Sequence, residues 1–321
     1  MSYGVLRDLT IEKRAMRDVY CDTLIELATE NDKVIGFDAD LMNSVGMVKF
    51  GETFPERMIN CGIQEANMIG MASGSSAVGL IPFVHTFACF AARRTADQVF
   101  VSAAFAQANI RIIGSDPGVT AAFNGATHMP FEDVGIMRGF PTVTIIEPTD
   151  TVMLADVIRQ LEKLIGVYYI RLSRKNVIGI YEDGSTFEIG KGALLKDGMD
   201  VTLIASGIMV SETMKAAEKL EQLGISTRVI NIYTIKPIDK EIIITAANET
   251  GAIVTAENHN YINGLGSAVA EVLAENRPVP MARIGVEDQF GQVGSVEYLK
   301  EIYGLTADNI VEKALKTIKR K

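Results

Sequence analysis

Residues 57–84 read RMINCGIQEANMIGMASGSSAVGLIPFV, and this stretch decides the fold class. Two short apolar runs within it, Arg57–Cys61 and Leu80–Val84, are typical of buried strands. Between them, Ala66–Ala77 has the length and the residue pattern of a helix. The order strand, helix, strand predicts that both strands belong to a parallel α/β sheet.

The same alternation continues on both sides of this stretch. The other elements that we expect in the first part of the chain are the strands Lys33–Phe37, Ile110–Ile113, Thr142–Ile146 and Tyr168–Leu172 and the helices Glu12–Glu30, Ala92–Ala106 and Asp150–Leu164.

The glycine-containing segment Arg174–Gly192 interrupts this pattern and is interpreted as a linker with a hairpin. The alternation then restarts, with strands at 200–204, 226–231, 251–255 and 279–284 and helices at 210–223, 240–248 and 267–274. We therefore predict an α/β protein with two parallel-sheet, three-layer domains, residues 1–185 and residues 186–321.

Composition excludes several classes of function. The chain has 321 residues, 48% of them apolar, and a formal net charge of −9, which disfavours binding to nucleic acid. No apolar stretch approaches the roughly 20 residues needed to span a bilayer, and the first residues lack the core of a signal peptide. Three cysteines without metal-ligand spacing indicate a reducing compartment, so we expect a cytoplasmic location and no metal site built by this chain alone.

Three segments carry candidate chemistry. Glu65 follows a strand at the first turn of a helix, where the helix dipole alone would favour an acid. Phe87 and Phe90 are expected on one helical face ahead of two arginines, an arrangement that suits a planar ring and a phosphate. His128 ends a polar loop after the strand at 110–113, where parallel sheets bind ligands. His85 and His259 are left open between structural and functional roles.

The order and spacing of these segments resemble the transketolase family from Arg17 to the C-terminus. The segments that carry the resemblance are Gly62-Ile-Gln-Glu-Ala-Asn-Met68, Thr86-Phe-Ala-Cys-Phe90, Asp97-Gln-Val99, Gly125-Ala-Thr-His128, Leu172-Ser-Arg174, Glu257-Asn-His-Asn260 and Gly264-Leu-Gly-Ser-Ala-Val269.

The resemblance implies thiamine diphosphate as the cofactor, which supplies the difficult chemistry while the protein orients it. Glu65 would hydrogen-bond the pyrimidine, Phe87 and Phe90 would pack around that ring, and Asp40 would lie near the thiazolium.

One arginine of the cofactor site is ambiguous, because the helix is one residue longer than usual in the family. Counting forward from Phe90 selects Arg93, which we take as the cofactor-binding residue, whereas counting back from Asp97 selects Arg94.

The resemblance also implies the substrate residues. Arg17, Ser44 and Arg174 fall where the family binds the phosphate end of a sugar, a role suited to guanidinium groups and a hydroxyl. His128 would contact the reacting oxygens of the sugar, so that Glu65 and His128 are the predicted catalytic residues.

One departure from the family bears on substrate choice. The sequence has Ala122-Phe-Asn124 where most members have a short acidic segment ending in Asp. Asn124 can still hydrogen-bond a substrate hydroxyl, but as a neutral group, and Phe123 is bulkier. The usual pentose phosphates are therefore not expected to be the sole substrates, and other ketose phosphates or sulfonates remain open.

The family's Gly-Asp-Gly motif for Mg²⁺ and diphosphate occurs nowhere in the chain. We therefore expect an N-terminal transketolase subunit to hold the metal and diphosphate, in an α2β2 assembly that transfers a two-carbon ketol unit from a ketose phosphate to an aldose. Two alternatives stay open: the β subunit of another thiamine enzyme (of the 2-oxoacid dehydrogenase or deoxyxylulose-phosphate synthase type), and a non-catalytic regulatory partner.

Overall fold

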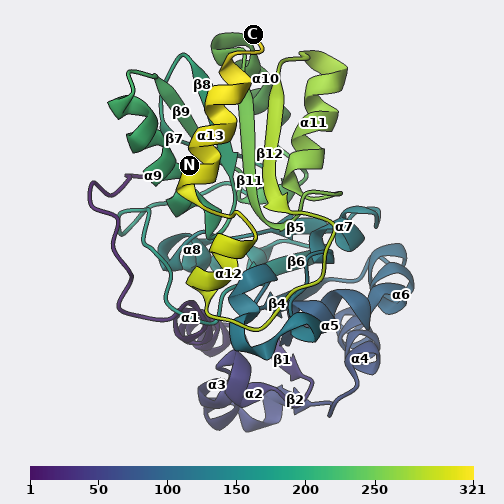
Figure 1. Ribbon diagram of the computed structural model, residues 1–321. Coiled ribbons are helices and arrows are strands. Elements are labelled where there is room, and N and C mark those ends of the chain that lie inside the picture. The colour runs from purple at the N-terminus through teal and green to yellow at the C-terminus, as the bar shows by residue number, and fades with distance from the viewer.

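A seven-stranded sheet forms the lower half of the molecule in Figure 1, in a computed structural model that describes residues 1–321. Its strand order is β10-β5-β6-β4-β3-β1-β2, and every neighbouring pair is parallel except β10 with β5. Its strands are β1 (Val34–Asp38), β2 (Met58–Asn60), β3 (Ile81–Phe87), β4 (Ile110–Ser115), β5 (Thr144–Ile146), β6 (Val167–Leu172) and β10 (Thr234–Lys236).

Helices cover both faces of this sheet, because successive strand residues point to opposite faces. Phe83 of β3 packs in a core that includes residues of α1 and α8, whereas Val84 packs in a second core with residues of α4 and α5. The helices of this half are α1 (Met16–Glu30), α2 (Met42–Val45), α3 (Val48–Thr53), α4 (Glu65–Ala77), α5 (Ala88–Arg93), α6 (Ala96–Gln98), α7 (Asp133–Arg138), α8 (Thr151–Lys163), the 3-10 turns η1 (Pro55–Arg57), η3 (Gly118–Asn124) and η4 (Ala126–His128), and the π-helix η2 (Val99–Phe105).

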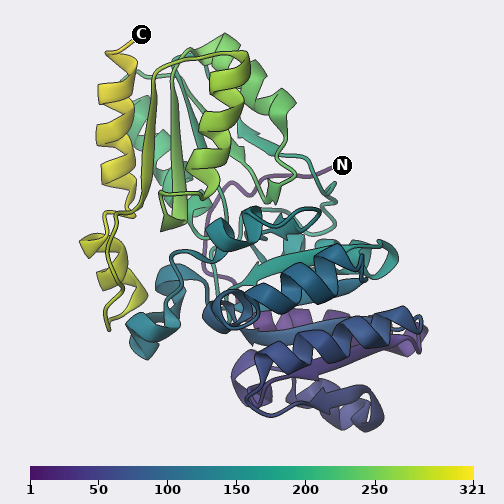
Figure 2. The ribbon, with the colours of Figure 1, turned by 90° about the vertical axis from the view of Figure 1, so that its right-hand side faces the viewer.

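A five-stranded sheet forms the other half, in the order β12-β11-β8-β9-β7. Figure 2 shows it nearly edge-on between two helical layers, with α13 on one side and α11 on the other. Residues of α9 and α13 pack in one core and residues of α10 and α11 in another. Its elements are β7 (Ala193–Lys196), β8 (Val201–Ala205), α9 (Met209–Gln222), β9 (Thr227–Asn231), α10 (Lys240–Thr250), β11 (Ile253–Asn260), α11 (Leu265–Asn276), β12 (Met281–Val286), α12 (Val296–Ile302) and α13 (Ala307–Ile318).

The predicted α/β class with two three-layer units is confirmed, with one addition. Each sheet has an antiparallel edge pair, β10 with β5 and β7 with β9, which the sequence pattern did not predict. β10 comes from beyond residue 185 and yet joins the first sheet. The predicted domain boundary near residue 185 stays a prediction.

The linker segment differs from the expected hairpin. Its residues pair instead with the N-terminal segment, through isolated bridges of Ser2 with Thr186 and Val5 with Tyr181. This N-terminal segment runs up alongside the second half of the molecule (Figure 1). Because residues 1–15 make these extended contacts, α1 begins at Met16 rather than at the expected Glu12. None of the helices is long and apolar enough to cross a membrane.

Candidate active site

The carboxyl ends of five parallel strands meet at one edge of the first sheet, the edge where such sheets bind ligands. The predicted site residues follow these strand ends. Asp40 comes after β1, Glu65 after β2 and Phe90 after β3, while Asn124 and His128 lie on the connection after β4, and Arg174 follows β6.

Glu65 is the first residue of α4, and its side chain is only 3% exposed. Its carboxylate accepts a hydrogen bond from Arg94 Nη1 at 2.8 Å. The guanidinium of Arg94 lies 3.7 Å from the centre of the Phe90 ring, a cation–π geometry. Of the two ambiguous arginines, Arg94 is therefore the one that meets Glu65.

Three rings gather beside this ion pair. The Phe87 and Phe90 ring centres lie 6.0 Å apart, and the His128 ring meets both edge-on, at 5.8 and 5.1 Å. Phe87 ends strand β3 instead of lying on a helix with Phe90, which corrects the expected shared helical face. The rings of Phe87, Phe90 and His128 form a cluster that we call the aromatic cluster. The nearly buried Glu65 and its partner Arg94 adjoin this cluster.

Arg93 takes a different direction from Arg94. It donates to the Thr127 carbonyl at 3.1 Å and forms an ion pair with Glu132 at 2.8 Å. Thr127 Oγ1 in turn lies 2.9 Å from His128 Nδ1. Partial burial lowers the pKa of His128, and the nearby positive charges of Arg93 and other arginines lower it further, which favours the neutral ring.

Arg174 joins the cluster from the end of β6. Its guanidinium lies 4.8 Å from the centre of the Phe87 ring and forms an ion pair with the buried Asp116. Burial raises the pKa of Asp116, although the Arg174 charge opposes this effect. A positive group is therefore held next to the aromatic cluster.

The other two predicted phosphate ligands lie near the start of α1. Arg17 Nη1 donates to the Ser44 carbonyl at 3.0 Å, so that main chain rather than hydroxyl makes this contact. The backbone of the preceding residue, Met16, donates to the Lys175 carbonyl at 3.2 Å. Because Lys175 follows Arg174, the backbones that carry Arg17 and Arg174 lie side by side.

Asp40 and Asn124 are two exposed residues among those predicted. Asp40 is exposed, has a left-handed φ of 64° and exchanges hydrogen bonds of 3.2 and 3.3 Å with Asn60 at the end of β2. Asn124 is exposed next to Phe123, which is 68% exposed. Both residues border the site without a hydrogen bond or ion pair to the aromatic cluster.

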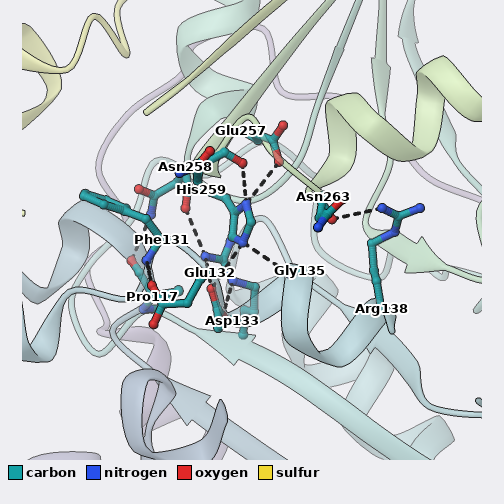
Figure 3. A network of polar contacts seen from close by, with 12 residues as sticks. Pro117, Phe131, Glu132, Asp133, Gly135, Arg138, Glu257, Asn258, His259 and Asn263 are labelled. Atoms are coloured by element: carbon teal, nitrogen blue, oxygen red, sulfur yellow. Dashed lines mark hydrogen bonds and ion pairs between the residues drawn. The ribbon is translucent and has the colours of Figure 1, made fainter. Parts of the chain in front are cut away.

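The two undecided histidines are both fully buried. His85 lies on β3, donates from Nδ1 to the Phe37 carbonyl and accepts from Tyr20 at 2.6 Å, so that it serves the core. His259 Nε2 accepts from the Gly135 amide at 3.3 Å (Figure 3). Burial lowers the pKa of each to about 4, so both rings are neutral at pH 7.

A buried ionic network that the sequence analysis missed lies behind the site. Arg171 is 1% exposed and donates to both oxygens of Asp133, at 2.8 and 3.1 Å, and to Glu147 at 2.6 Å. Ser206, in the second half of the molecule, donates to the other Glu147 oxygen at 2.5 Å. Burial would raise the pKa of Asp133, but the Arg171 charge lowers it. The network therefore joins the two halves through buried hydrogen bonds.

Comparison with known proteins gives the family. Residues 12–178 match the family described as "Transketolase, pyrimidine binding domain", and residues 190–310 match "Transketolase, C-terminal domain".

Individual relatives match along nearly their whole length. The chain is 48% identical to the 6-deoxy-6-sulfo-D-fructose transketolase subunit SqwH of Clostridium sp. (strain MSTE9), over 98% of each chain. It is 37% identical to an apulose-4-phosphate transketolase subunit of Phocaeicola vulgatus, over 95% of this chain and 98% of that one. Among solved structures, "Split gene transketolase, inactive beta4 tetramer" matches with a TM-score of 0.90 and 41% identity, over 96% and 99% of the two chains. The chain belongs to the transketolase family and is similar to named subunits of split transketolases over 95% or more of its residues.

Proposed function

We propose that this chain is the pyrimidine-binding and C-terminal subunit of a split transketolase, which transfers a two-carbon ketol unit to an aldose with a partner subunit. The observation that carries the proposal is the Glu65 carboxylate, which is nearly buried at the carboxyl edge of the sheet beside Phe87 and Phe90. A regulatory protein has no need to bury an acid there, because burial of a carboxylate costs free energy.

The residues present fit the pyrimidine end of thiamine diphosphate. Two phenyl rings offer apolar faces to a planar ring, and Glu65 offers a hydrogen-bonding oxygen beside them. When bound, the cofactor supplies carbanion chemistry at its thiazolium ring. Glu65, Phe87, Phe90 and Arg94 would hold the pyrimidine; Arg93, which we predicted for this role, supports the His128 side of the site.

The residues of this chain then have distinct tasks. Arg94 holds Glu65 in place through its charge-assisted hydrogen bond. His128, neutral because of its burial and its cationic neighbours, can donate or accept a hydrogen bond at the sugar oxygens. Asp40 lies on the same sheet edge and would lie near the thiazolium, as the family resemblance implies.

For the substrate we propose a ketose whose far end carries an anion. Arg17 and Arg174 lie on adjacent backbones, and guanidinium groups bind phosphate and sulfonate oxygens alike. The named relatives point to two such donors, a 6-sulfo sugar and a sugar 4-phosphate. Because identity to the sulfo-sugar subunit is higher, we favour a sulfonate donor over a pentose phosphate, with Asn124 at a sugar hydroxyl.

The partner would be an N-terminal transketolase subunit that holds the diphosphate and Mg²⁺, in an α2β2 assembly. The missing Gly-Asp-Gly motif supports this division of the site. The three cysteines are all unpaired, in keeping with the expected cytoplasmic location.

The test is to purify the chain with its partner subunit and to measure ketol transfer with thiamine diphosphate and Mg²⁺. The donors to compare are 6-deoxy-6-sulfofructose, xylulose 5-phosphate and fructose 6-phosphate, each with the same aldose phosphate acceptor. We expect turnover by the pair, none by either subunit alone, and the highest kcat/KM with the sulfonate. Failure of the pair to turn over any of the three donors would contradict the proposed function.

A further inference from the structure

The connection between β4 and α7, residues 117–131, carries both Asn124 and His128, and we call it the His128 loop. It is held at its first end by Asn258, a fully buried residue of β11 in the second half of the molecule (Figure 3). The Asn258 side chain donates to the Pro117 carbonyl and accepts from the Val119 amide, both at 2.9 Å. A single amide group therefore fixes the loop backbone at two points.

This contact is tightly fitted. Gly118 lies between the two bonded loop residues with a left-handed φ of 55°, and a Cβ atom there would lie 2.2 Å from Asn258 Oδ1. The Asn258 backbone is itself fixed, because Arg171 Nη2 donates to its carbonyl at 3.0 Å. The buried ionic network around Arg171 thus fixes Asn258, and Asn258 in turn fixes the His128 loop.

The second half also holds the far end of the loop. The Asn260 amide donates to the Phe131 carbonyl at 2.9 Å, and the Tyr303 ring meets the Phe131 ring edge-on at 5.3 Å. β11 therefore bonds to the loop backbone on both sides of Asn124 and His128.

The middle of the loop needs such support. Ala122 has φ 47° and ψ −118°, a conformation that non-glycine residues adopt only when their surroundings impose it, at a cost of about 1–3 kcal/mol. Thr120 and Phe123 border a cavity of about 350 Å³ between the two halves, so this part of the loop is not packed against other residues on all sides. The fixed ends therefore help to define where the middle lies, together with the Arg93 bond to the Thr127 carbonyl.

We propose that Asn258 is a positioning residue for the reaction: through it, the C-terminal half sets the place of Asn124 and His128 relative to the sugar. This inference rests on the proposed function. It assigns a task in catalysis to a domain that makes no hydrogen bond or ion pair with the aromatic cluster.

The test is Asn258→Asp in the assembled pair of subunits. An ionised Asp keeps the bond from the Val119 amide but repels the Pro117 carbonyl, whereas a protonated Asp restores both contacts in nearly the same shape. The groups around position 258 are Arg171, which donates to the Asn258 carbonyl, and the acids Asp133 and Glu147 bound to Arg171. The neighbouring Glu257, whose pKa burial raises to about 7, is present in wild type and variant alike, so the ratio of the two kcat values isolates the change at position 258.

We expect kcat of Asn258→Asp to fall about 10- to 100-fold at pH 8, the size of loss that a displacement of about 1 Å produces. The ratio of variant to wild-type kcat should recover at least partly toward pH 6, as the buried carboxyl takes up its proton.

The Kd for thiamine diphosphate, measured by calorimetry, should change less than about threefold, because Glu65 and Phe87 lie on other strand connections. Asn276→Asp, a change of the same type on exposed α11, is the matched control with unchanged kcat.

A merely structural role predicts another pattern, with kcat, cofactor affinity and assembly falling together and no recovery at low pH; that pattern would overturn the inference. If Asn258→Asp does not assemble, Tyr303→Leu tests the other end of the loop, with an expected fall in kcat of about threefold or more. Unchanged kcat in that variant would count against the inference too. Wild-type turnover decides the proposed function separately, since it is measured without either variant.

Discussion

Arg94 Nη1 lies 2.8 Å from Glu65 Oε1, and it is the only cation bonded to that nearly buried carboxylate. The guanidinium is half exposed and stacks on Phe90, so the Phe90 ring and the Glu65 carboxylate together hold it in place. The ion pair links Glu65 to the aromatic cluster, so substitution of either Glu65 or Arg94 tests the proposed site.

Glu65→Gln should remove the acid that would share a proton with the pyrimidine, while preserving the shape of the side chain. Gln can still accept the bond from Arg94 but cannot share a proton, so we expect kcat of the assembled pair to fall at least about 100-fold. Assembly and the melting temperature should change little. Glu56→Gln, at an exposed position of η1, is the control. Turnover within about threefold of wild type would favour the regulatory alternative.

A double-mutant cycle separates the two arginines. Arg94→Gln leaves Glu65 without its ionic partner, whereas Arg93→Gln breaks a more exposed pair with Glu132. Because Arg94 is itself half exposed, we expect a coupling free energy with Glu65 of about 1 kcal/mol for Arg94 and near zero for Arg93. Urea unfolding of the single and double variants measures it. Equal coupling for both arginines would contradict the assignment.

Arg93→Gln should also change the titration of His128. Burial is the main cause of the lowered pKa of His128, and Arg93 is the next, so removal of this charge should raise the pKa. The acid limb of the kcat profile should then move to higher pH. NMR of the imidazole protons can follow the residue, because the other two histidines are buried with pKa values of about 4. Arg159→Gln, in a remote surface pair with Glu26, should leave the titration unchanged.

The buried carboxyl group of Glu257 should make the free energy of unfolding depend on pH. Burial raises the pKa of this residue from 4.5 to about 7, although its carboxylate accepts bonds from the Leu265 and Gly266 amides at the start of α11. Between these two pH values the folded chain binds more protons than the unfolded chain, so this group makes stability fall as pH rises, by about 3 kcal/mol in all.

The variant Glu257→Gln does not titrate and should escape this loss. The melting temperature of the variant relative to wild type should therefore be higher at about pH 8 than at about pH 5. A difference that is the same at both pH values would show that Glu257 is ionised throughout.

Sequence patterns predicted the regular elements well because these are long and periodic. The stretch 57–84 forms β2, α4 and β3 within a few residues of the expected bounds. The strand β10 escaped prediction because three residues carry no period, and its pairing with β5 lies about 90 positions away in the chain. The π-helix η2 escaped as well, because the expected single helix Ala92–Ala106 is divided in the structure among the end of α5, α6 and η2.

In the site, too, residues within local sequence motifs could be predicted, whereas contacts between residues distant in sequence could not. Glu65, Phe90 and His128 lie in recognisable segments, and the structure brings them together. The contacts of Asn258 with Pro117 and of Arg171 with Asp133 join residues far apart in sequence, and each residue alone is an ordinary strand or loop residue. The contact of Asn258 with Pro117 requires the packing of one half against the other, and the contact of Arg171 with Asp133 requires the packing of α7 against β6.

The antiparallel strand β10 makes the sheet of the first half depend on residues from the second half. Thr234 and Lys236 belong by sequence to the C-terminal half but complete the hydrogen bonding of Ile145 and Ile146 in the other sheet. A polypeptide truncated near residue 185 would expose that backbone edge to solvent, and an open sheet edge invites pairing with other chains. A division of the chain near residue 185 would therefore leave an N-terminal fragment prone to aggregate.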